Sequence, residues 1–324
     1  MLSILSVTFP FFALVLCGFA ATRSRLLPLE AIGGLNSFVL FFALPCMLFR
    51  FGSGTPIAEL LDAGVFGVYL LCALTLVGLT VLCTRNRGRG GAIGWNDAAF
   101  GALVAAFPNT GFMGVPLLVA LLGPAAAGPA IVTMVVDMVV TSSLCIALSR
   151  LDALDQHGAT AAARKALKGV LLNPMPWSIL LGALASALHW APPGPLGRTV
   201  ALLADAASPV ALFTMGAVLA RAQGLPEAGR PRQRLGDVPL LGFIKLLLHP
   251  LLVWGLGRGA MALGLPLSAA ALKVLVLVAA LPSASNVSML SERFGADTGR
   301  VARVILLSTV AAFLSFAGAV ACFA

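Results

Sequence analysis

Two short polar stretches, each inside a long apolar run, carry the side chains best suited to bind a ligand. They are residues 108–111 (PNTG) and 282–286 (PSASN). Proline removes a backbone donor and clashes with the preceding turn, so we expect Pro108 and Pro282 to break the helices that contain them. Lipid supplies no partner for the freed N–H and C=O groups, so such a break survives only beside protein, a cavity or a ligand.

The chemistry of these two stretches suits a small anion. A helix that restarts after a break begins with free N–H groups and a partial positive charge, and neither stretch contains a carboxylate. Polar side chains can cap the restarted helices or hydrogen-bond a ligand between them. The alternative is that they only satisfy the local backbone. The residues expected to bind substrate at the breaks are Asn109, Thr110, Gly111, Ser283, Ser285 and Asn286.

Composition indicates a membrane protein. Hydrophobic residues make up 60% of the 324 positions, charged residues only 10%, and mean hydropathy is +1.01, whereas soluble domains contain about 25% charged residues. A helix needs about 20 apolar residues to cross a bilayer. Runs of suitable length lie near residues 3–21, 32–49, 63–83, 97–121, 128–149, 170–190, 199–220, 238–257, 267–290 and 302–323. These runs predict an all-α membrane protein with ten transmembrane helices.

The basic residues predict the orientation. Most of the 21 lysines and arginines fall in loops on one side, whereas Arg50, Arg198 and Arg258 lie on the other. The positive-inside rule places the basic side in the cytoplasm and both termini in the periplasm or extracellular space, in the inner (plasma) membrane. The net charge of +9 is thereby explained without a nucleic-acid partner. The six cysteines lie in or beside apolar runs, as packing residues do.

The two halves of the chain resemble each other at two places. Residues 105–108 (AAFP) align with 279–282 (AALP), and residues 44–49 (LPCMLF) resemble 208–213 (SPVALF). With five spans in each copy, the second copy must enter the membrane from the opposite face. Two interrupted helices in matching halves indicate a transporter with its binding site at the breaks.

This symmetry divides the sequence into two inverted five-helix repeats with broken, crossing fourth and ninth helices. The predicted parts are a first repeat at residues 1–149, a cytoplasmic loop at 150–169 and a second repeat at 170–324. Such a pair of repeats can expose a central site alternately to each side of the membrane.

Ionisable residues inside the apolar runs form a second group of candidates. Asp137 lies at the centre of the fifth run, and Lys245 and His249 lie four positions apart in the eighth, on one helix face. A charge at the bilayer centre costs roughly 2.5 to 3.5 kcal/mol, so each should face protein or a cavity. Asp137 and Lys245 could form an ion pair, Lys245 could attract the anion, or Asp137 could carry a coupling proton.

Enzymatic chemistry finds no support in the sequence. The three histidines are far apart, and no metal-binding pattern, cofactor motif or catalytic set is present. Asp297-Thr298-Gly299 matches the aspartic-protease tripeptide, but it occurs once and that chemistry requires two facing carboxylates. We therefore expect neither an enzyme nor a cofactor.

The break motifs resemble those of a known family. Residues 108–117 (PNTGFMGVPL) are similar to the fourth-span signature of the auxin efflux carrier family, and residues 280–287 (ALPSASNV) to the ninth-span motif of its bacterial members, which include malonate and malate permeases. Asn173-Pro174 at the start of the sixth run is also similar. The resemblance implies a ten-helix fold with a scaffold of spans one, two, six and seven, often dimeric. Spans three to five and eight to ten would form a mobile unit.

Site residues follow from the same resemblance. It assigns Asn109 and Asn286 to the crossing of the broken helices and Pro45 to the substrate-facing part of the second span. The distantly related bile-acid symporters bind sodium with acidic and amide groups near the crossing, and the lack of carboxylates in both motifs here argues against sodium. The expected function is secondary transport of a mono- or dicarboxylate such as malonate or malate. A sodium-coupled symporter and an anion channel are the alternatives.

Overall fold

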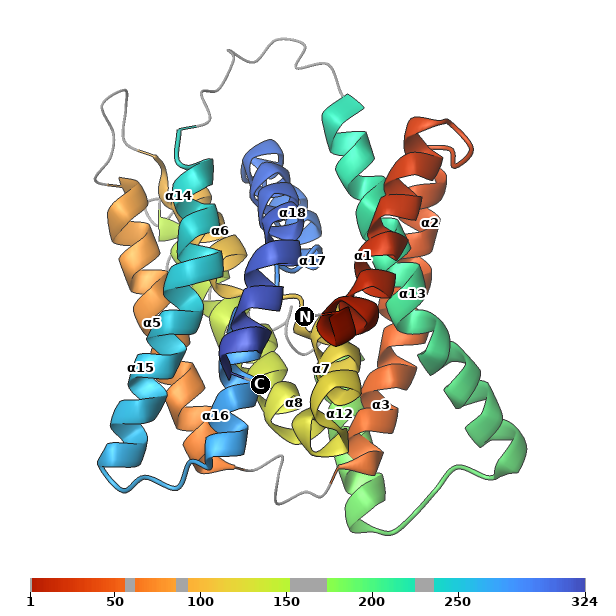
Figure 1. Ribbon diagram of the computed structural model, residues 1–324. Coiled ribbons are helices and arrows are strands. Elements are labelled where there is room, and N and C mark those ends of the chain that lie inside the picture. Colours follow the sequence, from red (N-terminus) through yellow and green to blue (C-terminus); the bar gives the residue numbers. More distant parts are fainter. Residues whose placement is uncertain (1, 56–61, 86–92, 152–173, 225–235, 324) are drawn as a thin grey trace. The chain divides into compact units, whose positions relative to one another are not determined.

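The computed structural model describes residues 2–55, 62–85, 93–151, 174–224 and 236–323 (Figure 1). Every regular element in these ranges is helical. The all-α prediction is therefore confirmed for the part of the chain that the structure describes. Residues 152–169 of the expected cytoplasmic loop, and Asn173, lie outside these ranges.

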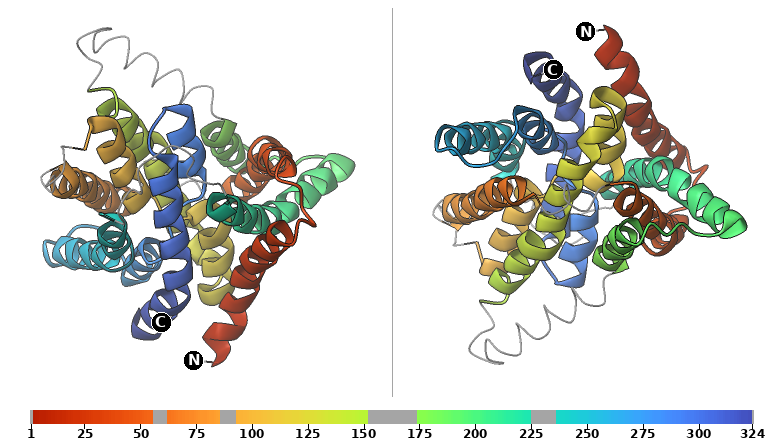
Figure 2. Two further views of the ribbon diagram at one scale, coloured as in Figure 1. Left: turned by 90° about the horizontal axis from the view of Figure 1, so that it is seen from above. Right: turned by 90° about the horizontal axis from the view of Figure 1, so that it is seen from below.

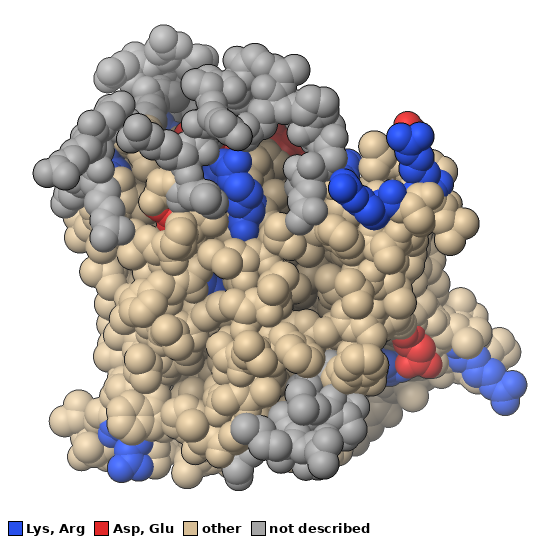
Figure 3. All heavy atoms as spheres, turned by 45° about the horizontal axis from the view of Figure 1, so that its top comes forward, with Lys and Arg blue, Asp and Glu red and all other residues tan. Residues whose placement is uncertain are grey.

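The described helices match the apolar runs of the sequence. Six are long and apolar enough to cross a membrane: 31–54, 63–85, 124–148, 194–221, 238–262 and 298–323. Shorter apolar helices include 110–122, which follows the first expected break, and 269–279, which precedes the second. On the face drawn in Figure 3, charged side chains form small groups and most of the described surface belongs to other residue types. The chain is a multi-pass membrane protein, and the inverted repeat stays a prediction.

The helices form two compact units, and each unit contains segments from both halves of the sequence. The first unit comprises Met1–Asp62, Thr110–Val132 and Pro174–Gly229. The second comprises Ala63–Asn109, Thr133–Asn173 and Arg230–Ala324. The first unit contains the expected scaffold spans, and it also includes the segment Thr110–Val132, which follows the break at Pro108.

The first unit is built on three close helix contacts. Its helices are α1 (Leu2–Arg23), α2 (Ala31–Phe38), η1 (Val39–Ala43), α3 (Leu44–Gly54), η2 (Thr110–Gly114), α7 (Val115–Leu122), η3 (Pro124–Ala126), α12 (Pro174–Ala187) and α13 (Gly194–Gly224). α1 packs along α13, and α3 packs against both α12 and α13 (Figure 2). Asp205 of α13 forms an ion pair with Arg50 of α3 at 2.6 Å, which gives this intramembrane carboxylate a partner.

The second unit surrounds a buried helix. Its helices are α5 (Ala63–Arg85), α6 (Trp95–Ala106), η4 (Val136–Thr141), α9 (Ser142–Leu148), α14 (Val238–Phe243), η6 (Ile244–Leu248), α15 (His249–Ala262), α16 (Ala269–Ala279), α17 (Asn286–Arg293) and α18 (Thr298–Phe323). α8 (Ala127–Val135) crosses the boundary between the units. All residues of α6 from Ala98 to Ala106 are buried, against α5, α9 and α18. Small side chains in this stretch allow those neighbours to approach closely.

An arginine joins three helix ends at one end of the second unit. Arg300 of α18 is buried, and its Nε and Nη2 donate to the two carboxylate oxygens of Asp237, while its Nη1 donates to the carbonyl of Asp97. Asp97 Oδ1 accepts from the N–H of Asp297 at 2.7 Å, and Asp297 Oδ1 accepts from the N–H of Arg300 at 2.9 Å. Asp297 therefore serves the start of α18, which gives the protease-like tripeptide a structural role.

Candidate functional site

The second unit contains both helix breaks, side by side. α6 ends at Ala106, and α16 ends at Ala279 with α17 beginning at Asn286. Pro108 and Ser283 form an antiparallel bridge. The N–H of Asn109 donates to the carbonyl of Pro282 at 2.8 Å, and that of Ala284 donates to the carbonyl of Phe107 at 3.0 Å. The two breaks thus pair each other's backbone, next to Pro108 in one and at Pro282 in the other.

This pairing corrects one expectation from the sequence. Free backbone N–H groups were expected at the breaks, but those of Asn109 and Ala284 are used in the bridge, and that of Ser283 donates to Ser308 Oγ at 3.1 Å. Ser285 occupies the N-cap position of α17, yet its side chain makes no capping bond. Three of the backbone donors expected to be free at the breaks are therefore already paired.

Several of these side chains contain a buried polar atom that has no hydrogen-bond partner among the described residues. Asn109 is 1% exposed and Ser283 is fully buried. Among the described residues, Asn109 Nδ2, Ser283 Oγ and Asn286 Oδ1 make no hydrogen bond. A buried polar atom without a partner costs about 1 to 3 kcal/mol, so each of these three atoms calls for an explanation. Rotation of the Asn286 amide by 180° exchanges its oxygen for an N–H donor.

The other substrate-binding residues predicted from the sequence belong to the first unit. Thr110 and Gly111 lie in η2, which packs against α13 and is held by a 2.6 Å hydrogen bond from Ser208 Oγ to the carbonyl of Phe112. Thr110 Oγ1 is buried and has no partner within the described chain. The roles of Thr110 and Gly111 in binding stay predictions.

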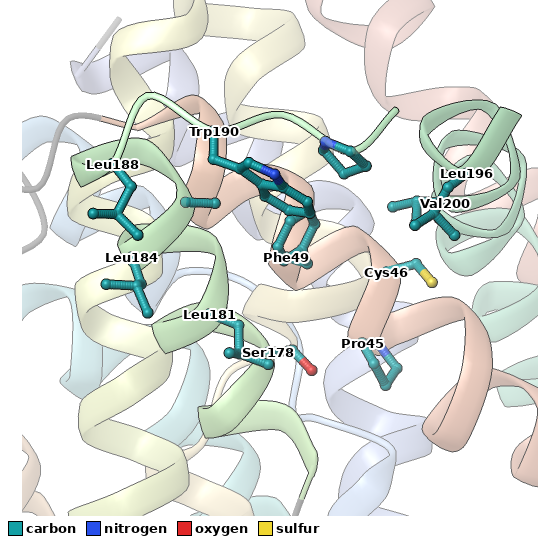
Figure 4. Close-up of a pocket in the computed structure, with 12 residues that line it drawn as sticks. Pro45, Cys46, Phe49, Ser178, Leu181, Leu184, Leu188, Trp190, Leu196 and Val200 are labelled. Carbon is teal, nitrogen blue, oxygen red and sulfur yellow. The ribbon is translucent and has the colours of Figure 1, made fainter. Parts of the chain in front are cut away.

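Pro45 lines a cavity of about 500 Å³ inside the first unit (Figure 4). The wall is formed by α3, by α12 and by the segment from Leu188 to Val200. The Trp190 and Phe49 rings belong to this wall, and the Ser178 hydroxyl, the Cys46 sulfur and the Trp190 ring nitrogen are its labelled side-chain groups other than hydrocarbon. No charged side chain lines the cavity among the described residues. It is therefore a poor site for a carboxylate, and a substrate contact at Pro45 stays a prediction.

A buried polar network surrounds Asp137 in the second unit. Asp137 is 0% exposed, and its two carboxylate oxygens accept hydrogen bonds from Tyr69 Oη at 2.8 Å and Thr141 Oγ1 at 3.1 Å. Its side chain forms no ion pair among the described residues. Sequence patterns gave no reason to single out Tyr69, apart from its being the single tyrosine of the chain.

Lys245 and His249 extend this network toward the second break. Lys245 Nζ lies 3.2 Å from His249 Nδ1, as the four-residue spacing predicts, and 2.8 Å from the carbonyl oxygen of Ala279. The His249 ring lies beside the Tyr69 ring, with centroids 6.1 Å apart. The structure therefore brings Asp137, Lys245 and His249 into one cluster, but with Lys245 bound to a helix end and no direct ion pair to Asp137.

Comparison with known proteins decides the family. A family described as membrane transport protein matches residues 3–320. The chain belongs to this family. The resemblance to auxin efflux carriers predicted from the break motifs is thereby confirmed, and the protein is a membrane transporter and not an enzyme.

Individual members of the membrane transport family are similar over nearly the whole chain. The chain is 29% identical over 324 residues to a "Putative malonate transporter" of Rhizobium meliloti, covering 98% of this chain and 95% of that protein. It is 26% identical over 303 residues to an "Uncharacterized transporter" of Methanothermobacter thermautotrophicus, with 93% and 92% covered. "Auxin efflux carrier component 8" of Arabidopsis thaliana is 24% identical over 327 residues, with 86% of each chain covered.

Proposed function

We propose that this protein is a secondary transporter of a small organic anion, a mono- or dicarboxylate of the malonate or malate type. The observation that carries the proposal is the pair of breaks in the second unit. Asn109 Nδ2, Ser283 Oγ and Asn286 Oδ1 there make no hydrogen bond among the described residues, and neither stretch of sequence contains a carboxylate. A carboxylate has lone pairs for several donors, so it satisfies the amide and hydroxyl groups that protein leaves open. The name of the Rhizobium meliloti relative supports the substrate class.

The transport cycle we propose is alternating access. Substrate binds at the breaks, and the helices of the second unit move as a body so that the site opens to one side of the membrane and then to the other. We propose that both termini lie on the outer face of the inner membrane, and the distribution of the basic residues supports this orientation. The homodimer implied by the family resemblance belongs to the same proposal and is checked by the mass of the purified protein in detergent.

Uptake by reconstituted protein tests this function. Proteoliposomes are expected to take up labelled malonate or malate with saturable kinetics and to show counterflow, in which unlabelled substrate inside accelerates entry of label. Both properties require a carrier, whereas a channel shows neither. If the protein takes up none of a panel of labelled mono- and dicarboxylates, the proposal is contradicted. Uptake that requires a sodium gradient would favour a sodium-coupled symporter instead.

We also propose that protons couple to transport at Asp137. The carboxylate is buried, accepts hydrogen bonds from Tyr69 and Thr141, and forms no ion pair among the described residues, so it can gain a proton without breaking one. Asparagine has the same size and keeps an acceptor but cannot titrate. The Asp137→Asn variant is expected to retain counterflow and to lose stimulation of uptake by an imposed proton gradient.

Asp205→Asn is the matched control for this prediction. Asp205 is also an intramembrane carboxylate, but it is more exposed and forms an ion pair with Arg50 in the first unit. This variant is expected to keep the response to the proton gradient. If a proton gradient stimulates uptake equally in Asp137→Asn and in the unchanged protein, Asp137 is not the site of proton coupling.

A further inference from the structure

The carbonyl at the end of α16 lacks the partner that a continuous helix would provide. In an α-helix the carbonyl of Ala279 would accept from the N–H four residues later, which is that of Ser283. That N–H donates instead to Ser308 Oγ at 3.1 Å. The neighbouring Val278 carbonyl also lacks its usual helical partner, because Pro282 has no N–H. The Val278 carbonyl accepts instead from the N–H of Leu281 at 3.1 Å. The break therefore leaves the Ala279 carbonyl open to a donor from another helix.

Lys245 supplies that donor. Its Nζ lies 2.8 Å from the Ala279 carbonyl oxygen, and the side chain is 0% exposed. The C-terminal end of a helix carries a partial negative charge, so a cation is favourable there. A buried ammonium would otherwise be strongly unfavourable, and among the described residues no carboxylate forms an ion pair with it. Among the described residues, the Ala279 carbonyl oxygen at 2.8 Å thus lies nearer to this ammonium than its other direct partner, His249 Nδ1 at 3.2 Å.

His249 fixes the direction of the lysine. Its Nδ1 lies 3.2 Å from Lys245 Nζ. An ammonium has donors and no acceptor, so Nδ1 accepts and the ring proton is on Nε2. The His249 ring is in turn held beside Tyr69, whose hydroxyl binds Asp137. Lys245 is therefore oriented by a buried chain of contacts that reaches from the helix break to Asp137.

We propose that the Lys245 ammonium is a built-in cation that stabilises the broken end of α16 and thereby positions the substrate-binding residues that follow it. Residues 280–285 form the link from Ala279 to α17, so the position of the Ala279 carbonyl constrains Ser283 and Asn286. This inference rests on the proposed function in one respect, that the break is the transport site.

Two substitutions of Lys245 distinguish the effect of losing the ammonium from the effect of losing the volume of the side chain. Lys245→Ala removes the ammonium and leaves space for a small amine, whereas Lys245→Met removes the ammonium but fills the space with a side chain of similar length. Both variants are expected to lower uptake about tenfold or more, the effect expected when a hydrogen bond to a charged group is lost. Methylammonium or ethylammonium is expected to restore uptake and raise the melting temperature of Lys245→Ala and to change neither in Lys245→Met.

The outcomes distinguish this inference from the proposed function. If the unchanged protein transports no carboxylate, the proposed function fails, but amine-dependent thermal stability confined to Lys245→Ala would still support the cation site. Equal effects of amines on both variants, or normal uptake by either variant without amine, would overturn the inference. If Lys245→Ala can be purified only with methylammonium present, that dependence supports the proposal. Failure to recover it even then, while Lys245→Met folds, would contradict it.

Discussion

Proteoliposomes that contain the Asn109→Ala variant are expected to show no saturable carboxylate uptake, and the same result is expected for Asn286→Ala. Each substitution removes a side-chain amide that lies at a break and has an atom without a hydrogen-bond partner among the described residues. A hydrogen bond to a charged group is worth about 1.5 to 3 kcal/mol, so losing one lowers affinity by about tenfold to a hundredfold. Misplacement of the bound anion adds to this loss, because transport requires substrate in one defined geometry.

The design of this measurement separates binding from folding. The backbone N–H of Asn109 bonds to the Pro282 carbonyl and is unaffected by alanine, so the bridge between the breaks is expected to persist. The side-chain amide atom Nδ2 has no protein bond to lose. Thermal stability should therefore change little, or rise. Asn36→Ala, in α2 of the first unit, is the control and should transport normally. Normal uptake by both break variants would exclude these asparagines from the site.

The breaks could be predicted from sequence because their cause is local. Pro108 and Pro282 lack an N–H wherever the chain goes, and each lies inside an apolar run long enough to span the bilayer. The boundaries of the spans followed from hydropathy for the same reason. The pairing of the two breaks was expected from the resemblance between the halves. The pairing takes the form of an antiparallel bridge between backbone groups. Such a bridge joins residues that are far apart in the sequence, so it could not be predicted from composition.

Other parts of the site could not be predicted because they also depend on contacts between residues far apart in the sequence. Lys245 and His249 were placed on one face by their spacing, but the contact of Lys245 with Ala279 joins residues 34 positions apart. Tyr69 donates a hydrogen bond to Asp137 and Ser308 accepts one from the N–H of Ser283, and neither residue belongs to a motif. Residue type suggested Ser283, Ser285 or Asn286 as a cap of the restarted helix, and Ser285, which occupies the N-cap position, makes no side-chain capping bond. Spacing predicts neighbours within a helix, while contacts between helices require the structure.

The first unit depends on two glycines, and alanine at either is expected to destabilise it strongly. Gly18 of α1 and Gly216 of α13 lie where these helices cross. A Cβ at Gly18 would lie 1.8 Å from the carbonyl oxygen of Phe213, and a Cβ at Gly216 would lie 1.8 Å from that of Val15. Both contacts are with backbone, which cannot rotate away as a side chain can. Small residues permit such close approach between membrane helices, and their loss forces the helices apart.

Overpacking of this kind typically costs about 1 to 3 kcal/mol, and we expect the upper end or more because backbone atoms clash. The Gly18→Ala and Gly216→Ala variants should therefore show a lower melting temperature in detergent and a smaller monodisperse fraction by size-exclusion chromatography. Gly33→Ala is the matched control, since a Cβ there meets nothing within 4 Å. Alanine favours a helix over glycine by up to about 1 kcal/mol, so this control should be neutral or slightly stabilising. Equal stability of Gly18→Ala and Gly33→Ala would show that α1 and α13 do not cross as closely as described, and the first unit would then need a different packing.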